Sequence, residues 1–254
     1  MTALDGKKGL VVGVANEASI AAGCARAFRD AGAELALTYL NDRAKPHVLP
    51  VAEAVGAEIL APLDVQDDSA METLFQRIRQ TWGKLDFVLH SIAYCPRDDL
   101  HGRVTDCSRE GFTTAMDISV HSLIRLARHA EPLMPEGGSL LTVSYYGAEK
   151  VVDHYNIMGP VKAALEATTR YLAAELGGAG IRVNALSPGP IRTRAASGIE
   201  HFDELIDEAR ERAPAHRLVT IEEVGDFAVH MVCDGARGVT GNVAYVDAGY
   251  HVMA

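Results

Sequence analysis

The stretch KGLVVGVANEASI, residues 8–20, decides the fold of this chain. Its first seven residues are a short apolar run typical of a buried strand. The run breaks at Gly13 into a turn, and residues 21–31 then have the amphipathic pattern of a helix. Residues 34–39, ELALTY, predict the next strand. This order begins a βαβ unit, in which the first N–H groups of the helix can bind a pyrophosphate.

The glycines of this turn leave a second interpretation open. They do not spell G-x-G-x-x-G, so the usual dinucleotide fingerprint is absent. Taken alone, the segment is equally compatible with the glycine-punctuated βα turn of any α/β protein. Ser19 is also a residue type that commonly caps helices, which gives it a purely structural alternative role.

Strand and helix patterns alternate along the rest of the chain. Further strands are expected at residues 58–65, 85–90, 139–144, 182–187 and 244–247, and helices at residues 71–82, 112–130 and 155–176. Such alternation predicts a doubly wound α/β fold, a parallel seven-stranded sheet with helices on both faces. Ligands of these sheets bind at the carboxyl ends of the strands. Five candidate site residues lie at such ends: Ser19, Asp64, Ser91, Tyr145 and Pro190.

Length and composition agree with a single domain spanning residues 1–254. Hydrophobic residues make up 48% of the chain, enough to fill the core of such a sheet, and no linker divides it. The net charge of −10 argues against nucleic acid and anionic membrane as partners. The four cysteines lie far apart without metal-ligand spacing, which indicates reduced thiols and no metal. No signal peptide or membrane span is expected, so we predict a cytoplasmic protein.

Tyr155 and Lys162 carry the candidate chemistry. If this stretch is helical, a spacing of seven puts both side chains on one face, about 10 Å apart along the axis. A phenol can donate a proton or hydrogen bond to a substrate oxygen, and a nearby ammonium stabilises negative charge and can hold a sugar diol. Tyr146 and Lys150 form an alternative pair with four-residue spacing. They lie in a predicted loop, where that spacing does not stack side chains.

Further motifs are specific in combination. GIRVNALSPGPIRT at residues 180–193, the Asp64-Val65 pair and DAGY at residues 247–250 resemble the short-chain dehydrogenase/reductase superfamily. Three departures narrow the match: the long turn after Gly13, HSIA at residues 90–93 in place of Asn-Asn-Ala-Gly, and Tyr155-x6-Lys162 in place of Tyr-x3-Lys. Together with SYYGAE at residues 144–149 and PIRTRAASGI at residues 190–199, they resemble the divergent branch of bacterial enoyl-acyl-carrier-protein reductases.

This resemblance implies a Rossmann-type fold and an NADH-dependent oxidoreductase that reduces the 2,3 double bond of enoyl thioesters in fatty acid biosynthesis. It implies catalytic roles for Tyr155, Lys162 and Tyr145. The implied cofactor-binding residues are Gly13, Ser19, Ile20, Leu40, Asp64, Val65, Ser91, Ile92, Ala93, Lys162, Pro190, Ile191 and Thr193. The implied substrate-binding residues are Cys95, Tyr145, Tyr155, Ala195, Ala196 and Ile199. Residues 195–218 would form a lid over the acyl chain, where Leu205 and Ile206 add apolar surface, and the superfamily commonly forms homotetramers.

The segment after the second strand bears on the choice of cofactor. NADP sites usually place Arg or Lys there, to meet the 2′-phosphate. Here Leu40 can pack on adenine, Asp42 would repel a phosphate, and Arg43 is the nearby cation. The sequence therefore favours NADH over NADPH.

The lid region bears on the thioester carrier. Acyl carrier proteins are acidic, yet the lid is rich in Asp and Glu, and Arg192, Arg194 and Arg217 only flank it. Either the carrier docks on those arginines, or the thioester is a different one, such as a coenzyme A ester. Two other functions stay open: a carbonyl reductase acting on 3-ketoacyl thioesters, and a non-catalytic NAD(P)-sensing module.

Four candidate residues have structural alternatives. Asp64 could cap the following helix rather than contact adenine. Cys95 could be inert packing, although its position after residues 91–94 favours pocket lining. For His90 and His154 we expect structural roles.

Overall fold

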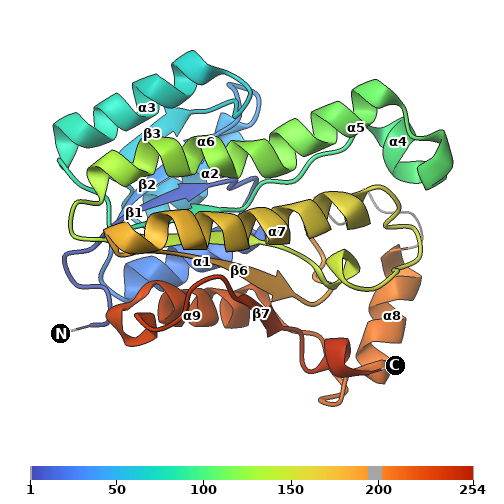
Figure 1. Ribbon diagram of the computed structural model, residues 1–254. Helices are drawn as coiled ribbons and strands as arrows, with labels where there is room; N and C mark the ends of the chain where they lie inside the picture. The colour runs from blue at the N-terminus through green and yellow to red at the C-terminus, as the bar shows by residue number, and fades with distance from the viewer. Residues whose placement is uncertain (1, 194–201, 254) are drawn as a thin grey trace.

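Seven parallel strands form one sheet in the order β3-β2-β1-β4-β5-β6-β7 in a computed structural model that describes residues 2–193 and 202–253 (Figure 1). The predicted seven-stranded α/β fold is confirmed. The strands are β1 (Lys8–Val12), β2 (Glu34–Tyr39), β3 (Ile59–Pro62), β4 (Phe87–His90), β5 (Gly138–Val143), β6 (Ile181–Pro188) and β7 (Val243–Val246).

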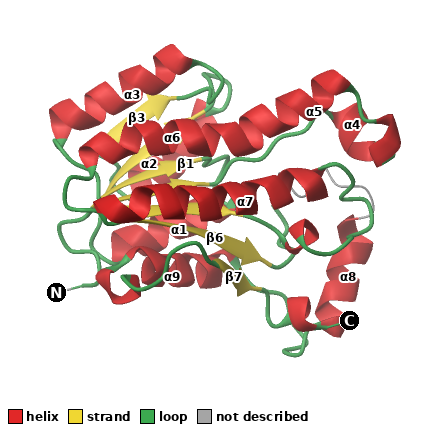
Figure 2. Cartoon of the chain, in the orientation of Figure 1, coloured by secondary structure: helices red, strands yellow, loops and turns green. Residues whose placement is uncertain are grey.

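Helices cover both faces of this sheet (Figure 2). One face packs against α3 (Asp68–Thr81), α6 (Ser122–Ala130) and α7 (Met158–Leu176), and the other against α1 (Ile20–Asp30), α2 (Lys45–Ala54) and α9 (Ile221–Val232). Alternate β1 residues serve the two cores: Leu10 belongs to the first and Val11 to the second, and both are fully buried. Burial on both faces explains why the strand is a continuous apolar run.

The predicted helix at residues 112–130 is interrupted. It consists of α5 (Arg109–Met116), a π-helical turn η2 (Asp117–His121), and α6. Two buried serines in and directly after this turn contact the end of β4 and the chain that follows it. Ser119 exchanges two hydrogen bonds with the backbone of Tyr94, and the Ser122 hydroxyl contacts His90 at 2.8 Å. These polar contacts lie at the candidate site edge, where π-bulges are frequent.

Four of the described α-helices lack a sequence prediction: α2 (Lys45–Ala54), α4 (Arg97–His101), α8 (Phe202–Arg212) and α9 (Ile221–Val232). The helix α2 contains Pro46 at its first turn and Pro50 inside, residues that argue against a helix, although proline fits a first turn. The helix α9 does carry a start signal, because Thr220 and Glu223 form a capping box. The other two, α4 and α8, lie beyond the carboxyl ends of the strands (Figure 1). Within the described ranges, no helix is both long and apolar enough to cross a membrane.

Candidate active site

The sheet topology brings the predicted site residues to one edge. Ser19, Asp64, Ser91, Tyr145 and Pro190 follow β1, β3, β4, β5 and β6, and these strands are parallel. β4 lies between β1 and β5, so Ser91 and Tyr145 follow neighbouring strands. Asp64 follows β3, which lies three strands from β4, or about 14 Å at normal strand spacing. A ligand that contacts both Asp64 and Ser91 must therefore be extended along the edge of the sheet.

Gly13 allows the end of β1 to touch the end of β4. Its backbone has φ +109°, a conformation that favours glycine. A Cβ atom at this position would lie 2.1 Å from the backbone oxygen of Ser91. The Ser91 N–H in turn donates to the Val12 carbonyl at 2.9 Å. The turn after β1 therefore leaves only glycine-sized room beside the chain after β4.

Ser19 is the N-cap of α1. Its hydroxyl accepts from the Ala22 N–H and donates to the Asn16 carbonyl at 2.7 Å. The capping role is therefore confirmed. The first turn of α1 contains no acidic residue, so its positive end can face an anion without a competing carboxylate on the same turn.

Tyr155 lies in the turn before α7, which starts at Met158. The expectation that Tyr155 and Lys162 share one helix is wrong. The neighbours His154 and Asn156 have φ of +62° and +45°, left-handed values that a continuing helix excludes. Tyr155 is nevertheless buried, with 8% of its surface exposed.

Lys162 is a buried lysine on the first turns of α7. Its ammonium donates a hydrogen bond of 2.6 Å to the Val143 carbonyl at the end of β5. Burial lowers the pKa of Lys162 to about 8, and the negative charge of Glu166 opposes that shift. Lys162 is therefore a cation that can lose its proton in the mildly alkaline range.

Tyr145 packs its ring edge-on against Tyr155. The Tyr145 hydroxyl is buried and has no hydrogen-bond partner among the residues that the structure describes. Burial raises the pKa of both phenols, so both stay protonated at neutral pH. Gly147 makes room for the pair, since a Cβ there would lie 2.5 Å from the Tyr155 ring. The site thus holds two protonated phenols and one ammonium.

His90 and Cys95 take no part in this chemistry as ionised groups. His90 is fully buried between the Thr142 and Ser122 hydroxyls, at 2.7 and 2.8 Å, and burial followed by the Lys162 charge lowers its pKa to about 3. Its expected structural role is confirmed. Burial is also the largest cause that raises the pKa of Cys95 to about 11, and the side chain packs against the core. Cys95 can therefore line a pocket but is a poor nucleophile.

Asp64 does not cap the helix that follows it. Asp67 is the N-cap of α3, accepting from the Ser69 and Ala70 N–H groups. The exposed Asp64 carboxylate accepts from the Gln66 N–H at 3.0 Å. The capping alternative for Asp64 is therefore wrong, and its carboxylate remains accessible to a ligand.

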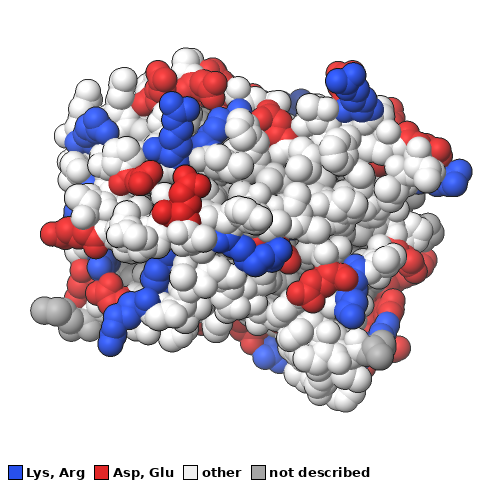
Figure 3. All heavy atoms as spheres, in the orientation of Figure 1, with Lys and Arg blue, Asp and Glu red and all other residues white. Residues whose placement is uncertain are grey.

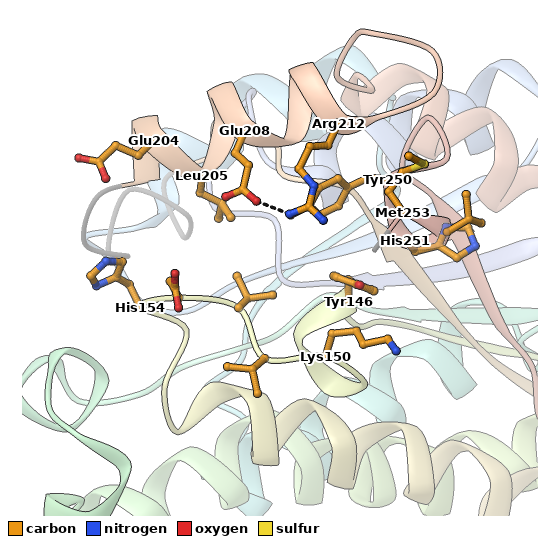
Figure 4. Close-up of a pocket in the computed structure, with 14 residues that line it drawn as sticks. Tyr146, Lys150, His154, Glu204, Leu205, Glu208, Arg212, Tyr250, His251 and Met253 are labelled. Atoms are coloured by element: carbon orange, nitrogen blue, oxygen red, sulfur yellow. Dashed lines mark hydrogen bonds and ion pairs between the residues drawn. The ribbon is translucent and has the colours of Figure 1, made fainter.

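A cavity of about 620 Å³ opens beside this group of residues, between the loop after β5, α8 and the C-terminal segment (Figure 4). Tyr146 and Lys150 line it, whereas Tyr155 and Lys162 do not. Across the cavity, Glu208 and Arg212 of α8 form an ion pair (Figure 4). His154 also lines the cavity and is exposed, so its structural role stays a prediction.

In the described part of the lid region, one of the two residues expected to offer apolar surface does not do so. Leu205 lines the cavity, but Ile206 is fully buried inside the fold, so the expectation that Ile206 adds apolar surface is wrong. Ile206 points inward because one side of the amphipathic α8 packs on the body of the protein. Three predicted substrate residues, Ala195, Ala196 and Ile199, lie outside the described residues.

The flanking arginines are engaged within the chain. Arg192 pairs with Asp203, and Arg217 donates to both carboxylate oxygens of Glu223 at 2.6 and 2.8 Å. Arg194 lies outside the described residues. A carrier that docked on Arg192 or Arg217 would have to compete with these acidic partners.

Known proteins resemble the chain over its whole length. Residues 13–251 match the family described as enoyl-(acyl carrier protein) reductase. An enoyl-[acyl-carrier-protein] reductase [NADH] of Rhizobium meliloti is 50% identical, covering 98% of this chain and 92% of its own, and one of Aquifex aeolicus is 48% identical, covering 100% and 94%.

Solved structures agree closely with the fold. The reductase of Anaplasma phagocytophilum in complex with NAD has a TM-score of 0.96 and 47% identity, covering 100% of this chain and 97% of its own. The Bacillus cereus enzyme with NADP+ and indole naphthyridinone has a TM-score of 0.97 and 47% identity, covering 100% of both chains.

Proposed function

The chain belongs to the enoyl-(acyl carrier protein) reductase family, and on that premise we propose that it reduces the 2,3 double bond of enoyl thioesters with NADH in fatty acid biosynthesis. The observation that carries the proposal is the placement of buried Tyr155 and Lys162 with half-buried Tyr145 at the carboxyl end of β5, on the same sheet edge as the turn at Gly13. The relatives that support it are named as NADH-dependent enoyl-acyl-carrier-protein reductases.

The three side chains divide the chemistry among them. NADH, when bound, supplies a hydride to the β-carbon of the enoyl thioester. Negative charge then develops on the thioester oxygen, and Tyr155 donates a hydrogen bond or proton to that oxygen. Such a donor stabilises charge that is present mainly at and after the transition state. Solvent finally protonates the α-carbon of the enolate, which gives the saturated thioester. Tyr145 helps to orient the thioester, because its buried hydroxyl has no partner within the described part of the chain.

Lys162 holds the ribose hydroxyls of the cofactor and keeps the local field positive. Its present partner, the Val143 carbonyl, is neutral, so moving the ammonium to a ribose diol breaks no ion pair with that partner. The remaining cofactor contacts are assigned to the turn after β1 and to the ends of the other strands. They are Gly13, Ser19, Ile20, Leu40, Asp64, Val65, Ser91, Ile92, Ala93, Pro190, Ile191 and Thr193.

The turn at Gly13 and the chain after β2 support an NADH site. The Gly13 turn has no room for a side chain, and the first turn of α1 has no acidic residue to repel a pyrophosphate. Leu40 has 54% of its surface exposed directly after β2, where it can pack on adenine. Asp42 is also exposed and would repel the 2′-phosphate of NADPH.

Residues 195–218 are proposed as the lid over the acyl chain. Of this range, α8 lies beyond the carboxyl ends of β6 and β7 (Figure 1). Ala209 and Ala213 pack against Tyr250 and Tyr146, which anchors α8 beside the cavity. Leu205, with Cys95 and with Ala195, Ala196 and Ile199, is assigned to the acyl chain.

The physiological substrate is proposed to be the acyl-carrier-protein thioester. The acidic character of α8, with five carboxylates against two arginines, makes docking on that helix unfavourable for an acidic carrier. We therefore expect the carrier to dock elsewhere at the site entrance. Salt screens the repulsion between the acidic carrier and α8, so the carrier should bind more tightly at high salt.

A homotetramer is proposed as the assembly. Phe112, Ile124 and Tyr171 of α5, α6 and α7 are 44%, 40% and 80% exposed. Figure 3 shows a broad uncharged area over α5 and the adjoining end of α7. Such a face suits a two-fold contact, and the apolar β7 at the sheet edge suits a second one. Light scattering at micromolar concentration should give the mass of four chains, and a monomer would contradict the proposal.

A cytoplasmic location is also proposed. The four cysteines are all free thiols, which is the usual state in a reducing compartment.

The function is tested by NADH oxidation with crotonyl and dodecenoyl thioesters, each on acyl carrier protein and on coenzyme A. We expect turnover with both chain lengths and a lower KM on acyl carrier protein. A matched 3-ketoacyl thioester is the comparison, and faster turnover of that substrate would favour a carbonyl reductase. Cofactor binding without any consumption would favour a sensing module.

A further inference from the structure

Glu166 is a buried carboxyl group that the chemistry above does not use. It lies in the middle of α7, and only 5% of its surface is exposed. Glutamate is almost never this buried unless a partner compensates for lost hydration. The Ser144 hydroxyl supplies that partner, donating a hydrogen bond of 2.6 Å to Oε1 of Glu166. The contact favours the ionised carboxylate, which can only accept hydrogen bonds.

The end of β5 holds Glu166 and Lys162 together. Val143, the last residue of β5, accepts from the Lys162 ammonium, and Ser144, the next residue, donates to Glu166. Residues four apart lie on the same face of a helix, with Cβ atoms about 5–6 Å apart. Two consecutive residues of one chain segment therefore fix a carboxyl and an ammonium on one buried helix face.

The charge of Glu166 acts on the ionisation of both Lys162 and Tyr155. Burial lowers the pKa of Lys162 to about 8, while the Glu166 charge opposes this shift. Burial, and the charge of Glu149 with it, raises the pKa of Glu166, whereas hydrogen bonding from Ser144 and the charges of Arg170 and Lys162 lower it. Burial also raises the pKa of Tyr155, and the charges of Tyr145 and Glu166 act in the same direction. A charged Glu166 thus favours the protonated forms of both Lys162 and Tyr155.

The other titratable groups near this face do not replace Glu166. His90, on β4, is held neutral by burial, which lowers its pKa to about 3. Glu149 and Arg170 are exposed to solvent, which screens their charges. Of the groups named here, Glu166 is the carboxyl that is buried, and it lies four residues from Lys162 on α7.

We propose that Glu166 is a positioning residue of the site: its carboxylate, held by the Ser144 hydroxyl, is the buried counter-ion that keeps Lys162 charged for cofactor binding. The inference rests on the proposed function through the role given to Lys162. Glu166 touches neither substrate nor cofactor in this account and acts only through Lys162 and Tyr155.

The test is the pH dependence of NADH binding, followed by fluorescence titration. In the wild-type protein, affinity should fall as pH rises through the pKa of Lys162. Glu166→Gln removes the charge with little change in shape, so this fall should move to lower pH. At the wild-type midpoint, the variant should therefore bind NADH more weakly than the wild-type protein. An unchanged midpoint would overturn the proposal.

Two further variants make the test specific. Glu175→Gln removes the same charge from an exposed position on α7, about 20 Å along the helix from Lys162, and should leave the midpoint unchanged. Ser144→Ala removes the hydrogen bond but keeps the carboxyl, and should move the midpoint in the same direction by less. If Glu166→Gln does not fold by circular dichroism, an unshifted midpoint in Ser144→Ala overturns the proposal.

The binding readout needs no thioester, which separates this inference from the proposed function. Wild-type turnover with an enoyl thioester is measured in parallel. A shifted midpoint without any wild-type turnover would support the role of Glu166 and contradict the reductase. Wild-type turnover with an unshifted midpoint would contradict the role of Glu166 alone.

Discussion

The ring of Tyr145 meets the ring of Tyr155 edge-on, with centroids 4.9 Å apart and planes inclined at 67°. Such a pair contributes about 0.5–1.5 kcal/mol beyond the area it buries. Because Tyr155 precedes α7, its position depends on this contact and on the loop after β5 rather than on a helix. The pair therefore places both phenols on the side of the sheet edge where Lys162 lies.

Replacing Tyr155 with Phe should reduce kcat by about 100- to 1000-fold, the range for loss of one transition-state hydrogen-bond donor. The ring contact with Tyr145 survives, so NADH affinity should change little. Steady-state kinetics and fluorescence titration measure the two effects. Tyr171→Phe, at an exposed position of α7, is the control and should retain full turnover. Near-normal turnover of Tyr155→Phe would remove Tyr155 from its role.

Replacing Lys162 with Ala should weaken NADH binding by at least about tenfold, because the proposed ribose contact contributes about 1.4 kcal/mol or more. The variant should also lose the pH dependence of binding. Burial lowers the pKa of Lys162 to about 8, so the ammonium is charged below that pH and neutral above it. Affinity that still falls through the same pH range in the variant would assign the titration to another group.

Replacing Lys150 with Ala tests the alternative Tyr146–Lys150 pair. Lys150 is exposed and lines the cavity on the side opposite α8 (Figure 4), and Tyr155 does not line that cavity. Turnover and NADH affinity should both stay within about twofold of wild type, as is usual for an exposed side chain outside the site. A large loss of turnover would transfer the catalytic role to this pair.

Replacing Gly13 with Ala should lower both thermal stability and NADH affinity. The added methyl would need φ +109° and would meet the Ser91 oxygen at 2.1 Å. The strain should cost about 1–3 kcal/mol. Gly238→Ala is the matched control, because no atom lies within 4 Å of the added methyl. Equal melting temperatures for the two variants would show that the turn after β1 yields easily.

Local patterns predicted the sheet because β1, β2, β4 and β5 are short apolar runs buried on both faces. The edge occupied by Ser91 and Tyr145 then followed from parallel topology. The sequence did not predict the turn that holds Tyr155. The spacing of Tyr155 and Lys162 does not show that the neighbours His154 and Asn156 adopt left-handed backbone conformations. The hydrogen bond from Ser144 to Glu166 joins positions 22 residues apart, and only the packing of α7 on β6 and on residues 146–148 brings them together.

The central claim is that hydride reaches the β-carbon of an enoyl thioester. The most direct measurement uses NADH carrying deuterium at the transferred position, crotonyl-acyl-carrier-protein as substrate, and mass spectrometry of the product. The account predicts a saturated butyryl product with one deuterium on its β-carbon, formed far more slowly by Tyr155→Phe. A crotonyl thioester that stays unreduced while the matched 3-ketoacyl thioester gains deuterium at its carbonyl carbon would contradict it.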